Sequence, residues 1–233
     1  MIINLENLEG LSSKYIEKLK RFDEIFKSFE FFEELEDNEN INNLILELHN
    51  HCLDNKIIGF HYTNAIENDI REKGMILRSG KEIRKDFMKR FLYLFNDNEQ
   101  RRIREEWLQR FGKKDSESRD YRIYFNFTKN ALSNKGAELL LKYYGGEQIY
   151  FPLFNLPVIN EKLEKIGKPM ILKCILEPRE IKTLIQNPWG KIIVSSYHKT
   201  LNPNASVVDQ DGYLKSAVLS KNIEIIDAKK YAY

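Results

Sequence analysis

The chain contains little cysteine, and the two cysteines it has, Cys52 and Cys174, lie far apart in the sequence. They provide neither a disulfide framework nor the paired spacing of zinc ligands, so a reducing compartment fits best. The chain also lacks an apolar run near the roughly 20 residues that span a bilayer. Its first residues lack the basic and apolar regions of a secretory signal. We therefore expect a soluble, cytoplasmic protein that does not enter a membrane.

Glycine and proline are scarce as well. With 11 Gly and 6 Pro among 233 residues, collagen-like and low-complexity classes are excluded. Hydrophobic residues make up 42% of the chain and aromatic residues 12%. A chain of this length and composition can bury a sizeable core, so global disorder is excluded too.

The charges are distributed unevenly. Residues 1–54 hold five Lys and Arg against 13 Asp and Glu, whereas residues 55–233 hold 32 against 22. The acidic segment has apolar residues at three- and four-residue steps, which predicts helices. We therefore expect two domains, an acidic helical extension over 1–54 and a second domain over 55–233.

The pattern changes to strands after Lys56. Residues 57–62 are typical of a buried strand, and Asn64 with Glu67 predicts a helix start that Gly74 ends. Residues 80–112 are expected to be helical. Further strands are expected over 121–128, 148–151, 170–176, 191–196 and 217–226. Helices and late strands without a regular alternation indicate an α+β fold.

The stretch His61-Tyr62-Thr63 is the most informative for function, because a histidine near the end of a strand is well placed to reach a cleft. This stretch, followed by an apolar helix and Gly74-Met75-Ile76, resembles the first motif of the ADP-ribosyltransferase superfamily. It is most similar to the branch with a His-x-Thr strand end, which includes DarT-like DNA-modifying toxins and bacterial abortive-infection relatives. Other segments resemble later motifs in order, namely Tyr124-Phe125-Asn126-Phe127-Thr128, the Tyr-Gly segment 143–151, the strand 169–178 and the closing strand 217–226.

The resemblance implies a split, strand-rich ADP-ribosyltransferase-like core with an N-terminal helical extension. It also implies NAD as cofactor, a nucleic acid or protein as acceptor, and a role as a toxin or phage-defence effector with an antitoxin or inhibitor. His61, Tyr62, Thr63, Tyr124 and Thr128 are then the expected cofactor-binding residues. No metal site is expected.

The catalytic acid is less readily assigned. Many members of this superfamily place a glutamate at the start of the closing strand, but residues 212–217 contain no carboxylate. The nearest candidates are Asp209 and Asp211, in what we expect to be a loop, and Glu147, which follows a double glycine. Such a carboxylate would stabilise the positive charge that develops on the ribose as the bond to nicotinamide breaks.

Two other functions remain open. The missing glutamate favours a catalytically inactive binding module with the same scaffold. The segment 78–122, with 14 Lys and Arg against 9 Asp and Glu, favours a nucleic-acid-binding regulator, because cations with interleaved aromatics can follow a phosphate backbone and stack bases. His49 and His51 have metal-ligand side chains without partners in the sequence pattern. His198 is expected in an exposed loop.

Overall fold

A computed structural model describes residues 1–112 and 119–231. The described residues combine helices with a seven-stranded sheet of order β5-β6-β3-β2-β4-β7, and β1 pairs with β2 beside this path. The expected mixture of helices and strands is therefore confirmed. The strand bounds are β1 (Ile2–Ile3), β2 (Lys56–Ala65), β3 (Ile123–Asn126), β4 (Lys168–Leu176), β5 (Lys182–Thr183), β6 (Asp211–Leu214) and β7 (Ile223–Asp227).

The chain forms two compact units, and each unit is assembled from several stretches. Unit 1 comprises residues 1–60, 124–130 and 174–213, and unit 2 comprises residues 61–123, 131–173 and 214–233. The acidic segment 1–54 lies within unit 1, and a domain boundary after residue 54 stays a prediction.

Unit 1 contains the helices of the acidic segment and one late helix. They are α1 (Ser13–Lys20), α2 (Asp23–Ser28), α3 (Phe32–Glu36), α4 (Glu39–Leu53) and α13 (Pro188–Leu201), with a short 3-10 turn, η3 (Pro178–Glu180). The predicted helices of residues 1–54 are thus confirmed. Asn38 is the N-cap of α4, because its side-chain oxygen accepts hydrogen bonds from the amides of Asn40 and Ile41.

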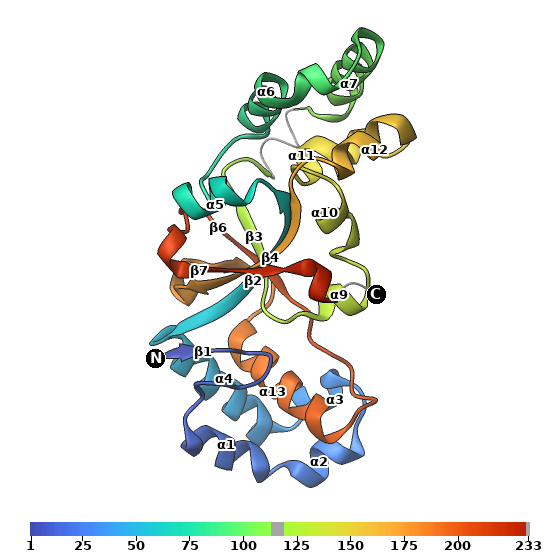
Figure 1. Cartoon of the computed structure of the whole chain (residues 1–233). Helices are drawn as coiled ribbons and strands as arrows, with labels where there is room; N and C mark the ends of the chain where they lie inside the picture. The colour runs from blue at the N-terminus through green and yellow to red at the C-terminus, as the bar shows by residue number, and fades with distance from the viewer. Residues whose placement is uncertain (113–118, 232–233) are drawn as a thin grey trace. The chain divides into compact units, whose positions relative to one another are not determined.

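The helices α4 and α13 lie side by side in unit 1 (Figure 1). α4 buries Ile41, Leu44, Ile45 and Leu48 on one stripe, as its spacing predicts. At Gly190 of α13, an added Cβ would lie 1.9 Å from the carbonyl oxygen of Ile45. The glycine therefore allows the two backbones to approach closely.

Unit 2 contains most of the helices in the middle of the chain. Its helices are α5 (Glu67–Lys73), α6 (Gly80–Phe91), α7 (Asp97–Arg110), α9 (Asn130–Ser133, whose first residue belongs to unit 1), α10 (Glu138–Lys142), α11 (Glu147–Tyr150) and α12 (Pro157–Glu164). Its 3-10 turns are η1 (Leu92–Leu94), η2 (Phe151–Leu153), η4 (Ser220–Asn222) and η5 (Ala228–Tyr231).

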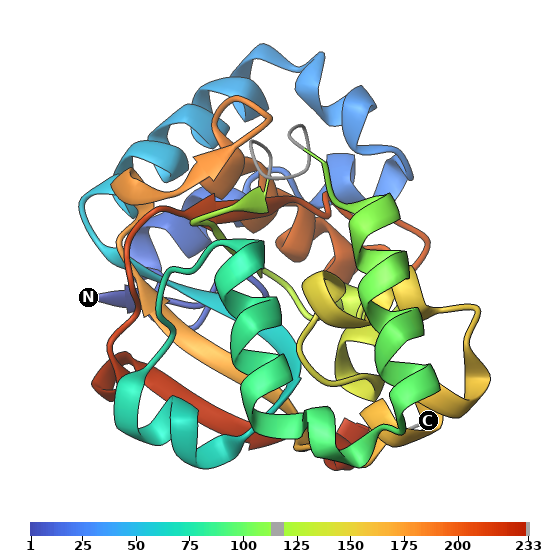
Figure 2. The same ribbon diagram turned by 90° about the horizontal axis from the view of Figure 1, so that it is seen from above.

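The helices α6 and α7 are connected by the turn η1 and run alongside each other (Figure 2). Ser79 and Asn96 cap their N-termini, each with a glutamate that completes a capping box. Phe87 and Trp107 meet edge to face, with ring centroids 5.7 Å apart, and the Trp107 indole donates to the carbonyl of Ile149. This aromatic core fixes both helices to α11. The predicted helical segment 80–112 is confirmed for these residues, whereas 113–118 of the basic segment lie outside the described residues.

Several predicted strands are wrong. Residues 148–151 lie in α11 and η2, and residues 191–196 lie in α13. The closing strand is shorter than predicted and starts at Ile223, because residues 220–222 form η4 and Val218 makes only a bridge to Met75. His198 is fully buried in α13 and its Nε2 bonds to the carbonyl of Phe29 at 2.9 Å, so its expected place in an exposed loop is also wrong.

Candidate functional site

The strand β6 begins at Asp211, one of the three carboxylates considered for the catalytic acid. Because side chains alternate along a strand, Asp211 and Tyr213 share one face, and Gly212 and Leu214 point to the other. The burial follows this alternation, since Gly212 and Leu214 are buried and the other two are not. The expected loop around Asp211 is therefore the start of β6, which lies between β5 and β3 in the sheet.

Tyr213 forms an aromatic pair with Tyr124 of β3. The ring centroids lie 5.4 Å apart at an interplanar angle of 48°. Tyr124 is 39% exposed, so the pair presents aromatic surface to solvent. Lys182 of β5 is the register partner of Tyr213, which places its side chain on the same face of the sheet. Tyr213 and Lys182 were not singled out from the sequence, although the alternation in residues 211–214 could have indicated the first.

Polar side chains hold the two aspartates of this region. Asp209 Oδ2 accepts a hydrogen bond from Asn130 Nδ2 at 3.0 Å. Asp211 Oδ1 accepts one from Gln210 Nε2 at 3.3 Å, and the same amide also bonds to the Asp211 carbonyl. Both aspartates are exposed. We refer to Tyr124, Tyr213, Asp209, Asp211 and Lys182 as the tyrosine–aspartate cluster, which lies entirely within unit 1.

Thr128 lies just after β3 in the same unit and is buried. Its hydroxyl accepts a hydrogen bond from the amide of Asn130 at 3.4 Å. The neighbouring Lys129 is held by Glu6, to which its amide donates at 2.9 Å. Thr128 therefore helps to shape the turn that presents Asn130 to Asp209, and its expected contact with a cofactor stays a prediction.

The His61-Tyr62-Thr63 stretch lies inside β2 and belongs to unit 2. Tyr62 is buried, whereas His61 and Thr63 share the opposite, partly exposed face of the strand. The strand continues to Ala65, so His61 does not end it, and the predicted cap at Asn64 is wrong. The Asn64 side chain instead donates to the carbonyl of Lys142 at 3.0 Å, and α5 begins only at Glu67.

Glu147 also belongs to unit 2, where it is the first residue of α11. Its carboxylate forms an ion pair with Arg119. Burial, with a smaller contribution from the charge of Glu147, raises the pKa of nearby Tyr150 to about 12. The carboxylate of Glu147 is thus already paired with the guanidinium of Arg119 within unit 2.

The eight predicted site residues are divided between the two units. Unit 1 holds Tyr124, Thr128, Asp209 and Asp211, and unit 2 holds His61, Tyr62, Thr63 and Glu147. Within unit 1, Tyr124 of β3 and Asp211 of β6 lie on one face of the sheet. Tyr213 shares this face with Asp211 and contacts the ring of Tyr124. One site that unites all eight stays a prediction.

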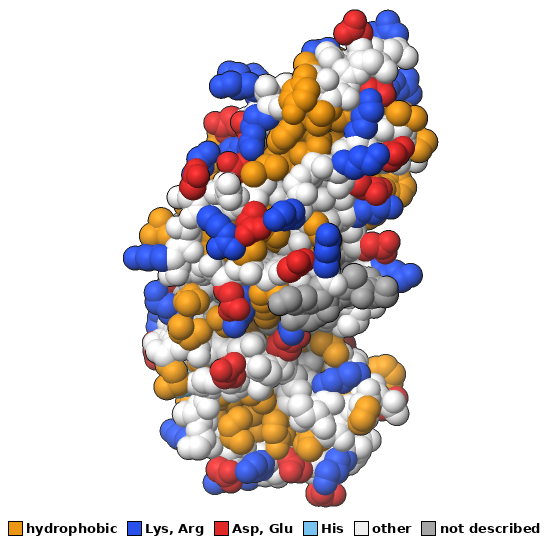
Figure 3. Space-filling model, in the orientation of Figure 1, with side chains coloured by type: hydrophobic (Ala, Val, Ile, Leu, Met, Phe, Trp, Pro, Cys, Tyr) orange, Lys and Arg blue, Asp and Glu red, His pale blue; other side chains and the backbone are white. Residues whose placement is uncertain are grey.

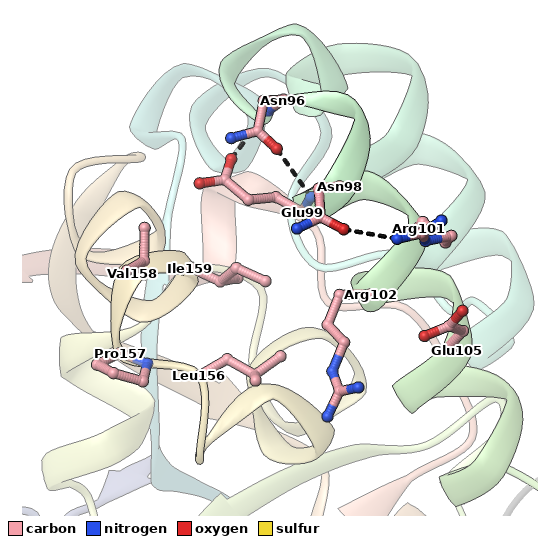
Figure 4. Close-up of a pocket in the computed structure, with 10 residues that line it drawn as sticks. All are labelled: Asn96, Asn98, Glu99, Arg101, Arg102, Glu105, Leu156, Pro157, Val158 and Ile159. Atoms are coloured by element: carbon pink, nitrogen blue, oxygen red, sulfur yellow. Dashed lines mark hydrogen bonds between the residues drawn. The ribbon is translucent and has the colours of Figure 1, made fainter.

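The described part of unit 2 contains an open depression of about 630 Å³ between α7 and α12 (Figure 4). Leu156 and Ile159 contribute apolar surface, and several of the polar residues are already engaged. Glu99 accepts from Asn96 and from Lys162, and Arg101 donates to Asn98. A second open depression, of about 900 Å³, lies in unit 1 between the end of α4 and Glu177. Neither depression is lined by a predicted site residue.

Other reactive residue types are buried and separate. Burial raises the pKa of the Cys52 and Cys174 thiols to about 12, so neither is a thiolate near neutral pH. Among residues 1–112 and 119–231, no three His, Cys, Asp or Glu side chains are grouped to hold a metal ion. In the same ranges, no helix is long and apolar enough to cross a membrane.

In comparisons with known proteins, no family model, curated protein or solved structure matches the chain.

Proposed function

We propose that the protein is an NAD-dependent ADP-ribosyltransferase that acts on a macromolecule, either a nucleic acid or a protein, as a toxin or phage-defence effector. The observation that carries the proposal is the place of Asp211 as the first residue of β6, on the face of the Tyr124–Tyr213 pair. The sequence resemblance calls for a carboxylate at the start of the closing strand, and residues 212–217 contain none. Asp211 begins the preceding strand, β6, and is the carboxylate that we assign to this role.

The residues of the tyrosine–aspartate cluster suit the chemical parts of NAD. The exposed aromatic pair offers a surface on which a flat nicotinamide ring can stack. The Asp211 carboxylate can accept a hydrogen bond from a ribose hydroxyl, and the Lys182 ammonium can pair with a phosphate. This match depends only on the position of these side chains on one face of the sheet.

When bound, NAD would supply the bond between nicotinamide and ribose: nicotinamide would leave with the bonding electrons, positive charge would develop on the ribose, and a nucleophile of the acceptor would form the new bond. Asp211 would stabilise that charge, and the side-chain amide of Gln210 holds the Asp211 carboxylate in place. Asp209 adds a second negative charge, held by Asn130. The aromatic pair orients the ring that leaves. Glu147 is less suited to this role, because Arg119 already neutralises it.

The test is nicotinamide release from NAD by the purified protein, with pooled protein, DNA and RNA as acceptors. We expect Asp211→Asn to lower the rate about 100-fold or more, since one electrostatic contact of this kind contributes that much to a transition state. Glu147→Gln is the matched control and should leave the rate unchanged. If Glu147→Gln abolishes release while Asp211→Asn does not, the assignment of the acid is wrong.

An inactive binding module is the second candidate, and the observation behind it is the missing glutamate before the closing strand, where residues 212–217 contain no carboxylate. In that case NAD should raise the melting temperature with increasing concentration. No nicotinamide would be released by any variant. Absence of both binding and release would contradict both candidates.

A further inference from the structure

The helix α6 carries a row of lysines on its outer face. Lys81, Lys85 and Lys89 follow each other at four-residue steps, and all three are exposed. Successive members of such a row are neighbours on the helix surface, displaced by about 6 Å along the axis. The row therefore presents three cations in a line about 12 Å long.

The acidic residues of α6 do not neutralise this row. Glu82 accepts hydrogen bonds from the amide and the hydroxyl of Ser79, at 2.7 and 2.8 Å. Asp86 pairs with Arg78 at 3.2 Å and Arg90 at 3.5 Å. Lys81, Lys85 and Lys89 themselves form no ion pair with any residue in the described ranges. The charge of the lysine row is thus uncompensated.

The opposite face of α6 keeps the row directed outward. Phe87 is buried against Trp107, and Phe91 meets the ring of Tyr144 at 4.9 Å. Because this face is anchored in the aromatic core of unit 2, the lysines cannot turn inward. In the space-filling view, Lys and Arg side chains lie around an apolar patch over α6 and α7, with some Asp and Glu side chains among them (Figure 3).

Exposed aromatic rings accompany these cations. Tyr93, in η1 directly after α6, is 79% exposed. Phe151 is 42% exposed and lies under the guanidinium of Arg110, with 5.2 Å between the guanidinium carbon and the ring centroid. Tyr93 follows Lys89 by four positions, so the end of the lysine row leads directly into an exposed ring.

We propose that the lysine row and Tyr93 form a surface that binds single-stranded nucleic acid, DNA or RNA, without sequence preference. The lysines pair with successive phosphates, and an unpaired base stacks on Tyr93. Cations in a line beside exposed rings are the two parts from which such sites are built. A duplex fits less well, because its bases have no free face for Tyr93. Binding of the strand requires no NAD and stands independently of the proposed transferase activity.

The experiment measures fluorescence anisotropy of labelled 20-nucleotide dT and U strands with the full chain, from low to moderate salt. Three phosphate contacts predict that the logarithm of the association constant falls with the logarithm of salt concentration with a slope of about −2. Replacing all three lysines by glutamine should remove this slope, and each single Lys→Gln change should reduce it by about 0.7. Tyr93→Ala should weaken binding about 5- to 150-fold, whereas Tyr93→Phe should retain it.

The matched control changes as many charges in unit 1, with Lys14, Lys20 and Lys27 replaced by glutamine; its slope should equal that of the unchanged chain. Circular dichroism verifies that each variant is folded. The proposal is overturned if the α6 variant keeps the full slope, or if duplex DNA binds more tightly than either strand. It is also overturned if polyglutamate of equal charge or anionic vesicles compete as well as the strand does, which would indicate an acidic protein or a membrane surface.

Discussion

Two histidines of α4 make the stability of unit 1 sensitive to pH. Burial lowers the pKa of both His49 and His51 below the ordinary value of 6.5. His49 Nδ1 and His51 Nε2 are buried and have no hydrogen-bond partner in the described structure. The folded protein therefore favours their neutral forms.

The sign of the pH dependence follows from proton binding. Below about pH 6.5 the unfolded chain protonates these histidines while the folded chain resists it, so the unfolded state binds more protons and the free energy of unfolding falls as pH falls. We expect the melting temperature to decrease from pH 7.5 to pH 5.5. In a His49→Gln/His51→Gln variant this part of the profile should be flatter. An unchanged profile would contradict the assignment.

At the candidate site, the sequence suggested residues but not the elements that carry them. Asp211 and Tyr124 could be named because carboxylates and aromatics are the groups that the chemistry needs. The strand that begins at Asp211 could not be foreseen, because residues 211–214 alternate over too short a distance to separate strand from loop. Tyr213 and Lys182 depend on the pairing of β5 with β6, which connects residues about 30 positions apart.

At the scale of elements, the error at α13 has a physical cause. Ile192, Ile193 and Val194 form an apolar, β-branched run that is typical of a buried strand. In the structure the helix is buried on most of its circumference, including Trp189 and His198. A helix buried on several sides loses the periodicity that distinguishes it from a strand. Pro188 at its first turn was the available signal for a helix start.

The contact between α13 and α4 gives a prediction at the same scale. Replacing Gly190 by alanine should force the two helices apart, because the new methyl group would overlap the Ile45 carbonyl. Such overpacking costs about 1–3 kcal/mol, and each 1 kcal/mol lowers the melting temperature by about 2–4 °C for a chain of this length. Thermal unfolding followed by circular dichroism measures the change.

Gly112→Ala is the control for this substitution, since an added Cβ there meets no atom within 4 Å. It should leave the melting temperature close to that of the unchanged chain. Equal melting temperatures for both variants would show that α4 and α13 tolerate the larger side chain, and would contradict the close packing.

At the scale of the molecule, each compact unit is assembled from stretches that lie far apart in the sequence, and patterns along the chain do not show which stretches come together. Unit 1 gathers stretches from the beginning, the middle and the later part of the chain, and unit 2 gathers the remainder. A change of composition near residue 55 is visible in the sequence. Residues 174–213 pack on the acidic helices through contacts between α13 and α4, and the contacting residues are more than 130 positions apart in the chain.

Removal of residues 1–54 tests this arrangement. The deletion takes away α1 to α4 and β1, and with them the buried side chains of Leu19, Phe26, Ile41, Ile45 and Leu48. The face of α13 that packs on α2 and α4, including Tyr197 and His198 beneath Phe26, then loses its cover inside unit 1 and is exposed to water. We therefore expect the truncated chain to aggregate, or to lose cooperative unfolding, under conditions in which the whole chain is soluble. Size-exclusion chromatography and thermal unfolding of both proteins provide the measurement. A truncated chain that stays monomeric and unfolds as cooperatively as the whole protein would show instead that the acidic helices form a separate domain.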